Sequence, residues 1–174
     1  MDRLPHDIDI HTHQGPLRKD AVLCVDPTET EVLPDGDGFI SIGVHPWNAD
    51  KADQAVWQRL EKWLEDKRVV AVGETGLDRL RGPELTVQED VFRRQARLAG
   101  LHRLPVVVHC VRCTDRLLQI RHDFSGQWIY HGFRGKPELA RQLLDAGIDL
   151  SYGDKYNAAS YALTPAERRY RESD

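Results

Sequence analysis

Cysteine, long apolar runs and excess positive charge are all scarce in this chain. The three cysteines (Cys24, Cys110 and Cys113) are odd in number and follow no apolar leader, which predicts a reduced, cytoplasmic protein. No apolar run reaches the length of a membrane span, so we expect no membrane partner. The 24 basic and 28 acidic residues give a formal net charge of -4. A strongly basic face that binds nucleic acid by itself is therefore excluded, and phosphate binding would need bound cations or a local patch.

The length and composition are those of a folded domain. Forty per cent of the 174 residues are apolar, which is enough for a core and argues against disorder. No linker, repeat or low-complexity tract interrupts the chain, so residues 1–174 are predicted to form a single domain.

Short apolar runs alternate with longer amphipathic segments along the chain. The runs that predict strands are 7–10, 21–25, 39–44, 69–72, 105–108, 128–130 and 148–152, with a weaker, very polar eighth at 168–174. The segments that predict helices are 49–67, 86–100 and 137–146. This alternation indicates βαβ units and a parallel sheet.

Eight strands in this order predict an α/β fold, a TIM-type (β/α) barrel. Such barrels usually need about 200 to 250 residues or more, and this chain stops where a final helix would begin. We therefore expect a barrel that is incomplete at its C-terminal end, with an open doubly wound sheet as the alternative.

Histidines and a carboxylate follow several of these runs. His11 and His13 are two residues apart and so point the same way from a strand, while Glu74, His109 and His131 follow three other runs. The carboxyl ends of parallel strands form the rim that holds active sites. Imidazole and carboxylate gathered there are suited to a divalent metal.

Other residues near the rim are candidates for binding substrate. His45 follows the third run and is interpreted as a group that contacts the substrate or supports the ligands rather than as a ligand itself. Asp9 could orient His11 or could equally be a solvated carboxylate at a strand end. Arg112 and Lys155 follow later strands and could hold a phosphate, as could Arg134 and Lys136. The aromatic residues near the rim that could stack on a base are Trp47, Trp128, Tyr152 and Tyr156.

Each of these residues also has a simpler interpretation. A single histidine at a strand end is most often structural, surface arginines and lysines are most often solvated, and aromatic residues mostly pack. His6, His102 and His122 follow no strand-like run and are predicted to be structural. The Cys110-x-x-Cys113 pair matches a thioredoxin-like redox motif or half of a zinc knuckle, but no second pair accompanies it.

Taken in order, the motifs resemble those of the TatD family of metal-dependent hydrolases, usually described as deoxyribonucleases. The matching segments are Asp9-Ile-His-Thr-His13, Gly43-Val-His-Pro46, Gly73-Glu-Thr-Gly-Leu-Asp78, Val108-His-Cys110, Tyr130-His-Gly-Phe133 and Gly153-Asp-Lys-Tyr-Asn157. They cover nearly the whole chain, and the segment around Glu74 is the most specific.

The resemblance implies a set of metal ligands. It assigns this role to His11, His13, Glu74, His109, His131 and Asp174, with Glu74 bridging two ions and Asp174 orienting the attacking water. The strand before Asp174 lacks the family's usual leucines, and the final helix is missing, so Asp174 is expected to be the most weakly held ligand.

The resulting expectation is a deoxyribonuclease that cleaves DNA phosphodiester bonds with one or two divalent cations of zinc, manganese, magnesium or iron. DNA, or another phosphate-containing molecule, is the expected partner, and the oligomeric state is left open. The alternatives are an amidohydrolase-type esterase, lactonase or phosphoesterase for a small molecule, and a degenerate relative that binds metal without turnover.

Overall fold

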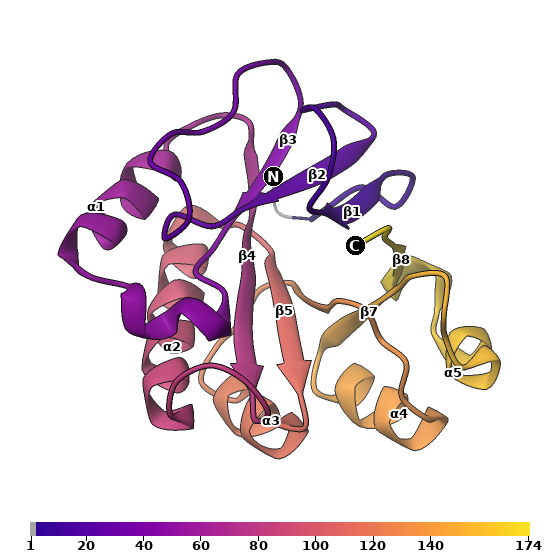
Figure 1. The fold of residues 1–174 in the computed structure, drawn as a ribbon. Coiled ribbons are helices and arrows are strands. Elements are labelled where there is room, and N and C mark those ends of the chain that lie inside the picture. The colour runs from indigo at the N-terminus through magenta and orange to yellow at the C-terminus, as the bar shows by residue number, and fades with distance from the viewer. Residues whose placement is uncertain (1–2) are drawn as a thin grey trace.

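The computed structural model describes residues 3–174, and eight parallel strands close there into a barrel (Figure 1). The strands are β1 (Asp9–Thr12), β2 (Ala21–Val25), β3 (Phe39–Ile42), β4 (Val69–Asp78), β5 (Val106–Val111), β6 (Trp128–Tyr130), β7 (Ile148–Tyr152) and β8 (Arg169–Arg171). The barrel closes where Asp9 of β1 pairs with Arg171 of β8. The expected barrel is confirmed, and the open-sheet alternative is wrong.

Helices cover only part of this barrel. They are α1 (Gln54–Trp63), α2 (Leu85–His102), α3 (Thr114–Arg121), α4 (Pro137–Asp145) and α5 (Ala158–Leu163), with 3₁₀ turns η1 (Pro46–Lys51) and η2 (Ala166–Arg168). Within residues 3–174 the connections from β1 to β2 and from β2 to β3 are loops, which explains how 174 residues can close a barrel. No helix formed by residues 3–174 is both long and apolar enough to cross a membrane.

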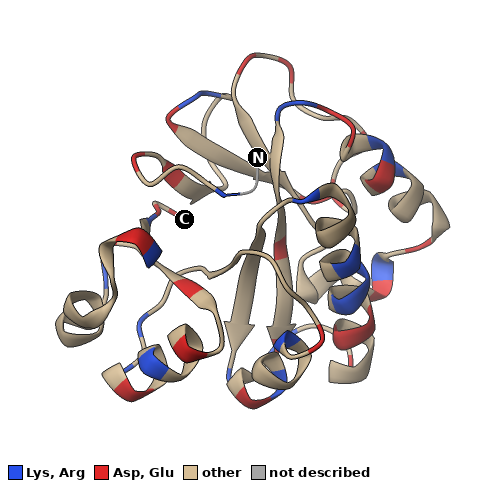
Figure 2. Cartoon of the chain, turned by 180° about the vertical axis from the view of Figure 1, so that it is seen from behind, with Lys and Arg blue, Asp and Glu red and all other residues tan. Residues whose placement is uncertain are grey.

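Apolar side chains alternate between the two sides of the strands. Val70, Val107 and Ile129 pack in a cluster that contains no helical residue and so fills the barrel interior. Their neighbours Val69, Val106 and Trp128 belong to the larger cluster that includes the helices. Outside, acidic and basic residues are interspersed along the helices (Figure 2).

Strand β8 is the element whose sequence is least strand-like. Its apolar contribution is Tyr170, only 2% exposed, which lies in the interior cluster and is hydrogen-bonded through its hydroxyl to Gln127 Nε2 (2.6 Å). Arg168, just before the strand, pairs with Asp149 (2.7 Å). One buried tyrosine and the ion pair of Arg168 therefore let a polar segment complete the sheet.

Strand β4 is longer than its apolar run predicts. It was expected to end at Val72, but it continues to Asp78 because Gly76 and its neighbours pair with β5 around His109. Glu74 therefore lies within a strand rather than after one.

Two buried glutamines of α2 fix the backbone around this part of the barrel. Gln88 accepts a hydrogen bond from Asp78 N (2.7 Å) and donates to Asp78 O (3.0 Å). Gln95 accepts from Val44 N (2.8 Å) and donates to Thr75 Oγ1 (2.7 Å). The helix thus holds the end of β4 and the residue before His45 in place.

We expect Gly76→Ala to destabilise the protein by more than about 2 kcal/mol. Gly76 has φ +146°, and a Cβ there would overlap the carbonyl oxygen of His109. Gly100→Ala is the control, since a Cβ on this exposed position of α2 meets nothing within 4 Å, and it should stabilise by roughly 0.5 kcal/mol. Urea unfolding measures both; equal effects would contradict the close approach of β4 to β5.

Candidate active site

The carboxylate of Glu74 lies at the centre of the rim and is 3% exposed. Five histidines from different parts of the barrel surround it. Two of them approach one carboxylate oxygen and three approach the other.

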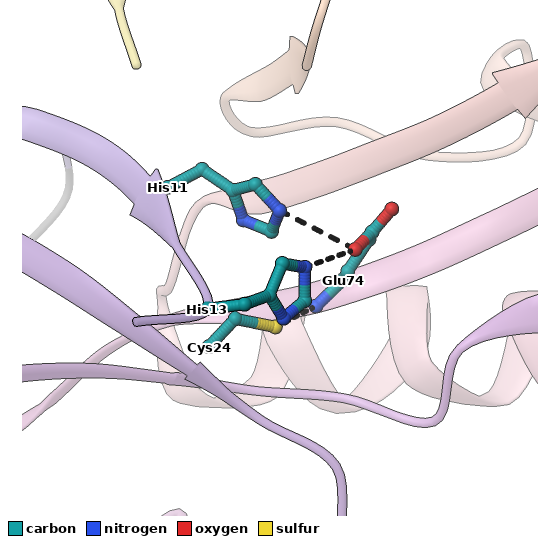
Figure 3. A group of neighbouring side chains, drawn as sticks. All are labelled: His11, His13, Cys24 and Glu74. Atoms are coloured by element: carbon teal, nitrogen blue, oxygen red, sulfur yellow. Dashed lines mark hydrogen bonds and ion pairs between the residues drawn. The ribbon is translucent and has the colours of Figure 1, made fainter. Parts of the chain in front are cut away.

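On the Oε2 side, His11 of β1 and His13 just after it both face the glutamate (Figure 3). Their Nε2 atoms lie 3.3 and 3.2 Å from Glu74 Oε2. The same two nitrogens lie 3.5 and 3.3 Å from Asp174 Oδ1. Two imidazoles and two carboxylates therefore converge on one point.

On the Oε1 side, three further histidines come together. His109 Nδ1 and His131 Nε2 each lie 2.7 Å from Glu74 Oε1, and His45 Nε2 lies 3.3 Å from it. The structure thus brings together all six residues predicted as ligands, and it also places His45 against the shared carboxylate.

Two carboxylates behind the histidines were not given a role from sequence. Asp78 Oδ2 lies 3.0 Å from His109 Nε2 and also accepts a hydrogen bond from Trp47 Nε1 (2.7 Å). Glu172 Oε1 lies 3.3 Å from His131 Nδ1. A carboxylate on the outer nitrogen fixes the orientation of an imidazole and raises its basicity, as is common for metal-binding histidines.

The segment that carries Asp174 was expected to be weakly held, but several contacts fix it. Glu172 N donates to Tyr152 O (3.1 Å), and Ser173 N donates to Asp9 Oδ1 (3.2 Å). Asp9 was a candidate for orienting His11, and its Oδ1 accepts a hydrogen bond from the His11 backbone N–H (3.1 Å). Asp9 therefore couples β1 to the segment after β8.

The charges in this cluster are strongly coupled. Burial alone would raise the pKa of Glu74, but the charge of His131 and hydrogen bonds from the other histidines hold that pKa well below its usual value. Burial lowers the pKa of His131, yet Glu74 and Glu172 raise it to about 10. The pocket therefore favours an ionised carboxylate facing positive charge.

The donor set fits a divalent cation. Neither ring nitrogen of buried His11 has a well-aligned hydrogen bond within the described chain, although Nε2 lies at ion-pair distance from Glu74 and Asp174, and Glu172 Oε2 has no partner there. Three groups each place their donor atoms within 4.8 Å of one another: His11, His13, Cys24 and Glu74; His11, His131 and Asp174; His45, Glu74 and His109. Imidazole nitrogen with carboxylate oxygen suits zinc, iron or manganese.

Cys24 is a site residue that sequence reasoning missed. Its Sγ accepts a hydrogen bond from Glu74 N (3.2 Å) and donates to Gly73 O (3.6 Å), and Figure 3 shows it beside His13 and Glu74. Burial and the nearby Glu74 charge raise the pKa of this thiol. Its place near the carboxyl end of β2 was the signal that could have identified it.

A cavity of about 400 Å³ opens onto the cluster. Beyond the histidines, its walls include Asp26, Glu29 and Trp47, which is 39% exposed. Arg81 lies over the Trp47 ring, 4.0 Å from its centroid. Neither Lys nor Arg is among the residues of the 3–174 segment that line this cavity.

The four residues predicted to contact phosphate, Arg112, Arg134, Lys136 and Lys155, do not line this cavity. Arg112 is exposed after β5, and its carbonyl accepts a hydrogen bond from Arg79 Nε (2.8 Å). Lys155 is exposed after β7 and lines a separate hollow that also includes Asp174. The structure brings Lys155 beside the site but does not bring Arg112 into the cavity.

Comparison with known proteins identifies the family. The family model described as TatD related DNase matches residues 29–171. The chain belongs to the TatD family. It is 32% identical over 120 residues to YjjV of Escherichia coli K12, named an uncharacterized metal-dependent hydrolase, covering 66% of this chain and 46% of the relative.

Another TatD relative carries a more specific name. The chain is 30% identical over 144 residues to the 3'-5' ssDNA/RNA exonuclease TatD of Pantoea ananatis, covering 76% of this chain and 55% of the relative. The chain therefore spans about half the length of these relatives. The crystal structure of the TatD homologue YjjV matches its fold with a TM-score of 0.75 at 24% identity, covering 97% of this chain and 78% of that one.

Cys110 and Cys113 have the properties of packed thiols in this TatD protein. Both are buried, and burial raises the pKa of Cys110 to about 12 and that of Cys113 above its ordinary value. Reactive redox cysteines instead have lowered pKa values and partial exposure.

We expect iodoacetamide at pH 7.5 to label Cys110 and Cys113 roughly a hundredfold more slowly in the native protein than in urea, because only thiolates react. Peptide mass spectrometry over time measures each site. Fast labelling of the native protein would revive the redox interpretation.

The carboxylates behind His109 and His131 lead to a second prediction. Asp78→Asn and Glu172→Gln should each weaken divalent metal binding by about 10- to 100-fold, since each removes the charge that orients an imidazole. Calorimetric titration with Zn²⁺ and Mn²⁺ measures this. Asp123→Asn, which removes a carboxylate paired with Arg93 on the surface, is the control. Wild-type affinity in both site variants would rule out the orienting role.

Proposed function

We propose that this TatD-family chain is a metal-dependent hydrolase that cleaves phosphodiester bonds of DNA with one or two divalent cations. The observation that carries the proposal is the Glu74 carboxylate shared between two sets of histidines, with Asp174 facing one set. The names of the relatives support the substrate class, since several are called 3'-5' ssDNA/RNA exonucleases.

The ligand roles follow the two sides of Glu74. His11, His13 and Asp174 would hold a cation on the Oε2 side, and His109 and His131 would hold one on the Oε1 side. Bound cations would polarise the phosphoryl group and make water a stronger acid. We propose that the cations are zinc, manganese or iron, because magnesium is less suited to a site rich in imidazole.

Asp174 has the geometry of the general base. Its carboxylate is about half exposed and so is reachable by water, while its Oδ1 is held between His11 and His13. It would accept the proton of the attacking water. Asp78 and Glu172 would keep His109 and His131 in orientation from behind.

His45 is suited to contact the substrate or to complete the second ion site. Its Nδ1 accepts the Trp47 backbone N–H (3.1 Å), so Nε2 is left directed toward Glu74 and the cavity. It lies in one of the three candidate ligand groups as well as in the cavity wall.

The composition of the cavity wall favours a second candidate, a hydrolase of small esters or lactones. Asp26 and Glu29 line the cavity, and a wall of this charge would repel a phosphate but not a neutral ester. The same ligand set would serve that reaction. Cleavage of p-nitrophenyl acetate without cleavage of bis(p-nitrophenyl) phosphate would identify this alternative.

The main test separates metal binding from turnover. Protein stripped by a chelator and reloaded with Mn²⁺ or Zn²⁺ should cleave a labelled single-stranded oligonucleotide. Asp174→Asn should retain metal through the other ligands but lose about 10²- to 10⁴-fold in kcat, since it removes the proton acceptor. Glu74→Gln should lose both metal and activity.

Two substitutions on the surface serve as controls for this test. Asp145→Asn and His122→Ala change exposed residues of α4 and of the turn after α3, and both should behave as wild type. Metal binding without cleavage by the wild type would show a degenerate relative and would overturn the proposal.

A further inference from the structure

Two hollows lie next to one another on the Asp174 side of the cluster. The first, about 230 Å³, shares Asp174 with the main cavity. The second, about 540 Å³, shares Gly153, Asp154, Glu172 and Ser173 with the first. The three hollows are therefore neighbours that share lining residues, and they extend from the catalytic cluster toward the loops after β6 and β7.

Two basic residues line the first hollow. Arg134 comes from the loop after β6 and Lys155 from the loop after β7, and both are exposed. Within residues 3–174 neither side chain makes an ion pair or a hydrogen bond. Both cations are therefore available to a ligand.

Most of the acidic groups of this hollow face a histidine. Glu172 pairs with His131, and Asp174 faces His11 and His13. Asp154 is the remaining side-chain carboxylate of the first hollow, and it lies there with the two cations Arg134 and Lys155. The opposite wall of the main cavity, with Asp26 and Glu29, is acidic instead.

The second hollow presents a stack of aromatic and cationic groups. Arg169 lies over the Tyr161 ring, 4.1 Å from its centroid, and Tyr156 stacks on Tyr161 with centroids 4.8 Å apart and planes at 30°. Tyr156 is 46% exposed and lines this hollow. The stack thus holds Tyr156 in position while leaving much of its ring open.

We propose that these two hollows bind one unpaired nucleic acid strand, with its phosphates on Arg134 and Lys155 and a base stacked on Tyr156. This deepens the proposed function and rests on it for the substrate class. Cations that follow a backbone and aromatic rings that take bases are the two components of single-strand binding. A duplex keeps its bases stacked inside and cannot offer one to Tyr156.

The difference in charge between the two sides of the cavity determines where the nucleic acid strand lies. The basic and aromatic hollows are on the Asp174 side, and the Asp26 and Glu29 wall is across the cavity. Repulsion of phosphates from the acidic wall confines the polymer to one side of the catalytic cluster. The strand is therefore expected to enter the site by one end rather than to pass through it.

The test measures binding without turnover. Fluorescence anisotropy of a labelled ten-nucleotide oligo-dT is followed in a chelator, from about 50 to 200 mM salt. Each phosphate contact contributes about 0.7 to the slope of log K against log salt for a single strand. Arg134→Gln with Lys155→Gln should therefore reduce the slope by about 1.4.

A matched control carries the same change of charge. Lys62→Gln with Lys67→Gln removes two exposed lysines in and after α1, which lies away from β7 and β8 (Figure 1). This pair should leave both the affinity and the slope as in wild type. Equal slopes for the two double variants would overturn the phosphate contacts.

The tyrosine gives a different signature. Tyr156→Ala should weaken binding about 5- to 150-fold, equivalent to the 1–3 kcal/mol of one stacked base, with no change in slope. Tyr156→Phe keeps the ring and should bind as wild type. Loss of affinity in both variants, or in neither, would overturn the stacking role.

Binding and catalysis can fail separately. If the strand binds with these signatures but the metal-loaded wild type cleaves no phosphodiester, the strand site stands and the proposed function falls. If the metal-loaded wild type cleaves but the Arg134, Lys155 and Tyr156 variants bind the oligonucleotide as wild type does, the proposed function stands and the strand site falls. Equally tight binding of poly-glutamate, with the same dependence on Arg134 and Lys155, would show a general polyanion site and overturn the proposal.

Discussion

The fold is organised around one buried negative charge, the carboxylate of Glu74. An isolated carboxylate taken out of water is so costly that it would normally become neutral. Here five imidazoles surround it, and the pKa of Glu74 stays well below its ordinary value despite burial. A bound cation would play the same part more strongly, because it offers a larger charge at a shorter distance. The site is thus built so that positive charge, from protons or from metal, is required.

Closure of the barrel is what makes that arrangement possible. The groups around Glu74 come from β1, β5, the residues after β6 and the segment after β8, which lie together only if β8 pairs with β1. Asp9 strengthens this junction, since it accepts hydrogen bonds from the backbones of both His11 and Ser173. Replacing two helical crossovers by loops shortens the chain without removing any of these strands.

The sequence predicted that His11, His13, Glu74, His109 and His131 lie close together because the carboxyl ends of parallel strands meet at one rim. It could not separate roles that depend on distances across the rim. Asp78 and Glu172 stand behind histidines while Asp174 stands in front, a difference that no spacing reveals. Cys24 was missed because its partner is the backbone of another strand. The sequence pattern of strand β8 is weak because a single interior residue, Tyr170, is its apolar contribution. Arg112 follows a strand but does not line the cavity.

An acidic chain and a polyanionic substrate are compatible because the charges are unevenly placed. The net charge of -4 is a sum over the whole surface, whereas a phosphate responds to groups within about 8 to 10 Å at physiological salt. Near the cluster, Glu74, Glu172 and Asp174 each face at least one histidine. Arg134 and Lys155 then dominate one side, and Asp26 and Glu29 dominate the other. On the proposed function, this local asymmetry would set the direction from which the strand approaches, and the overall charge would weaken its binding elsewhere on the surface.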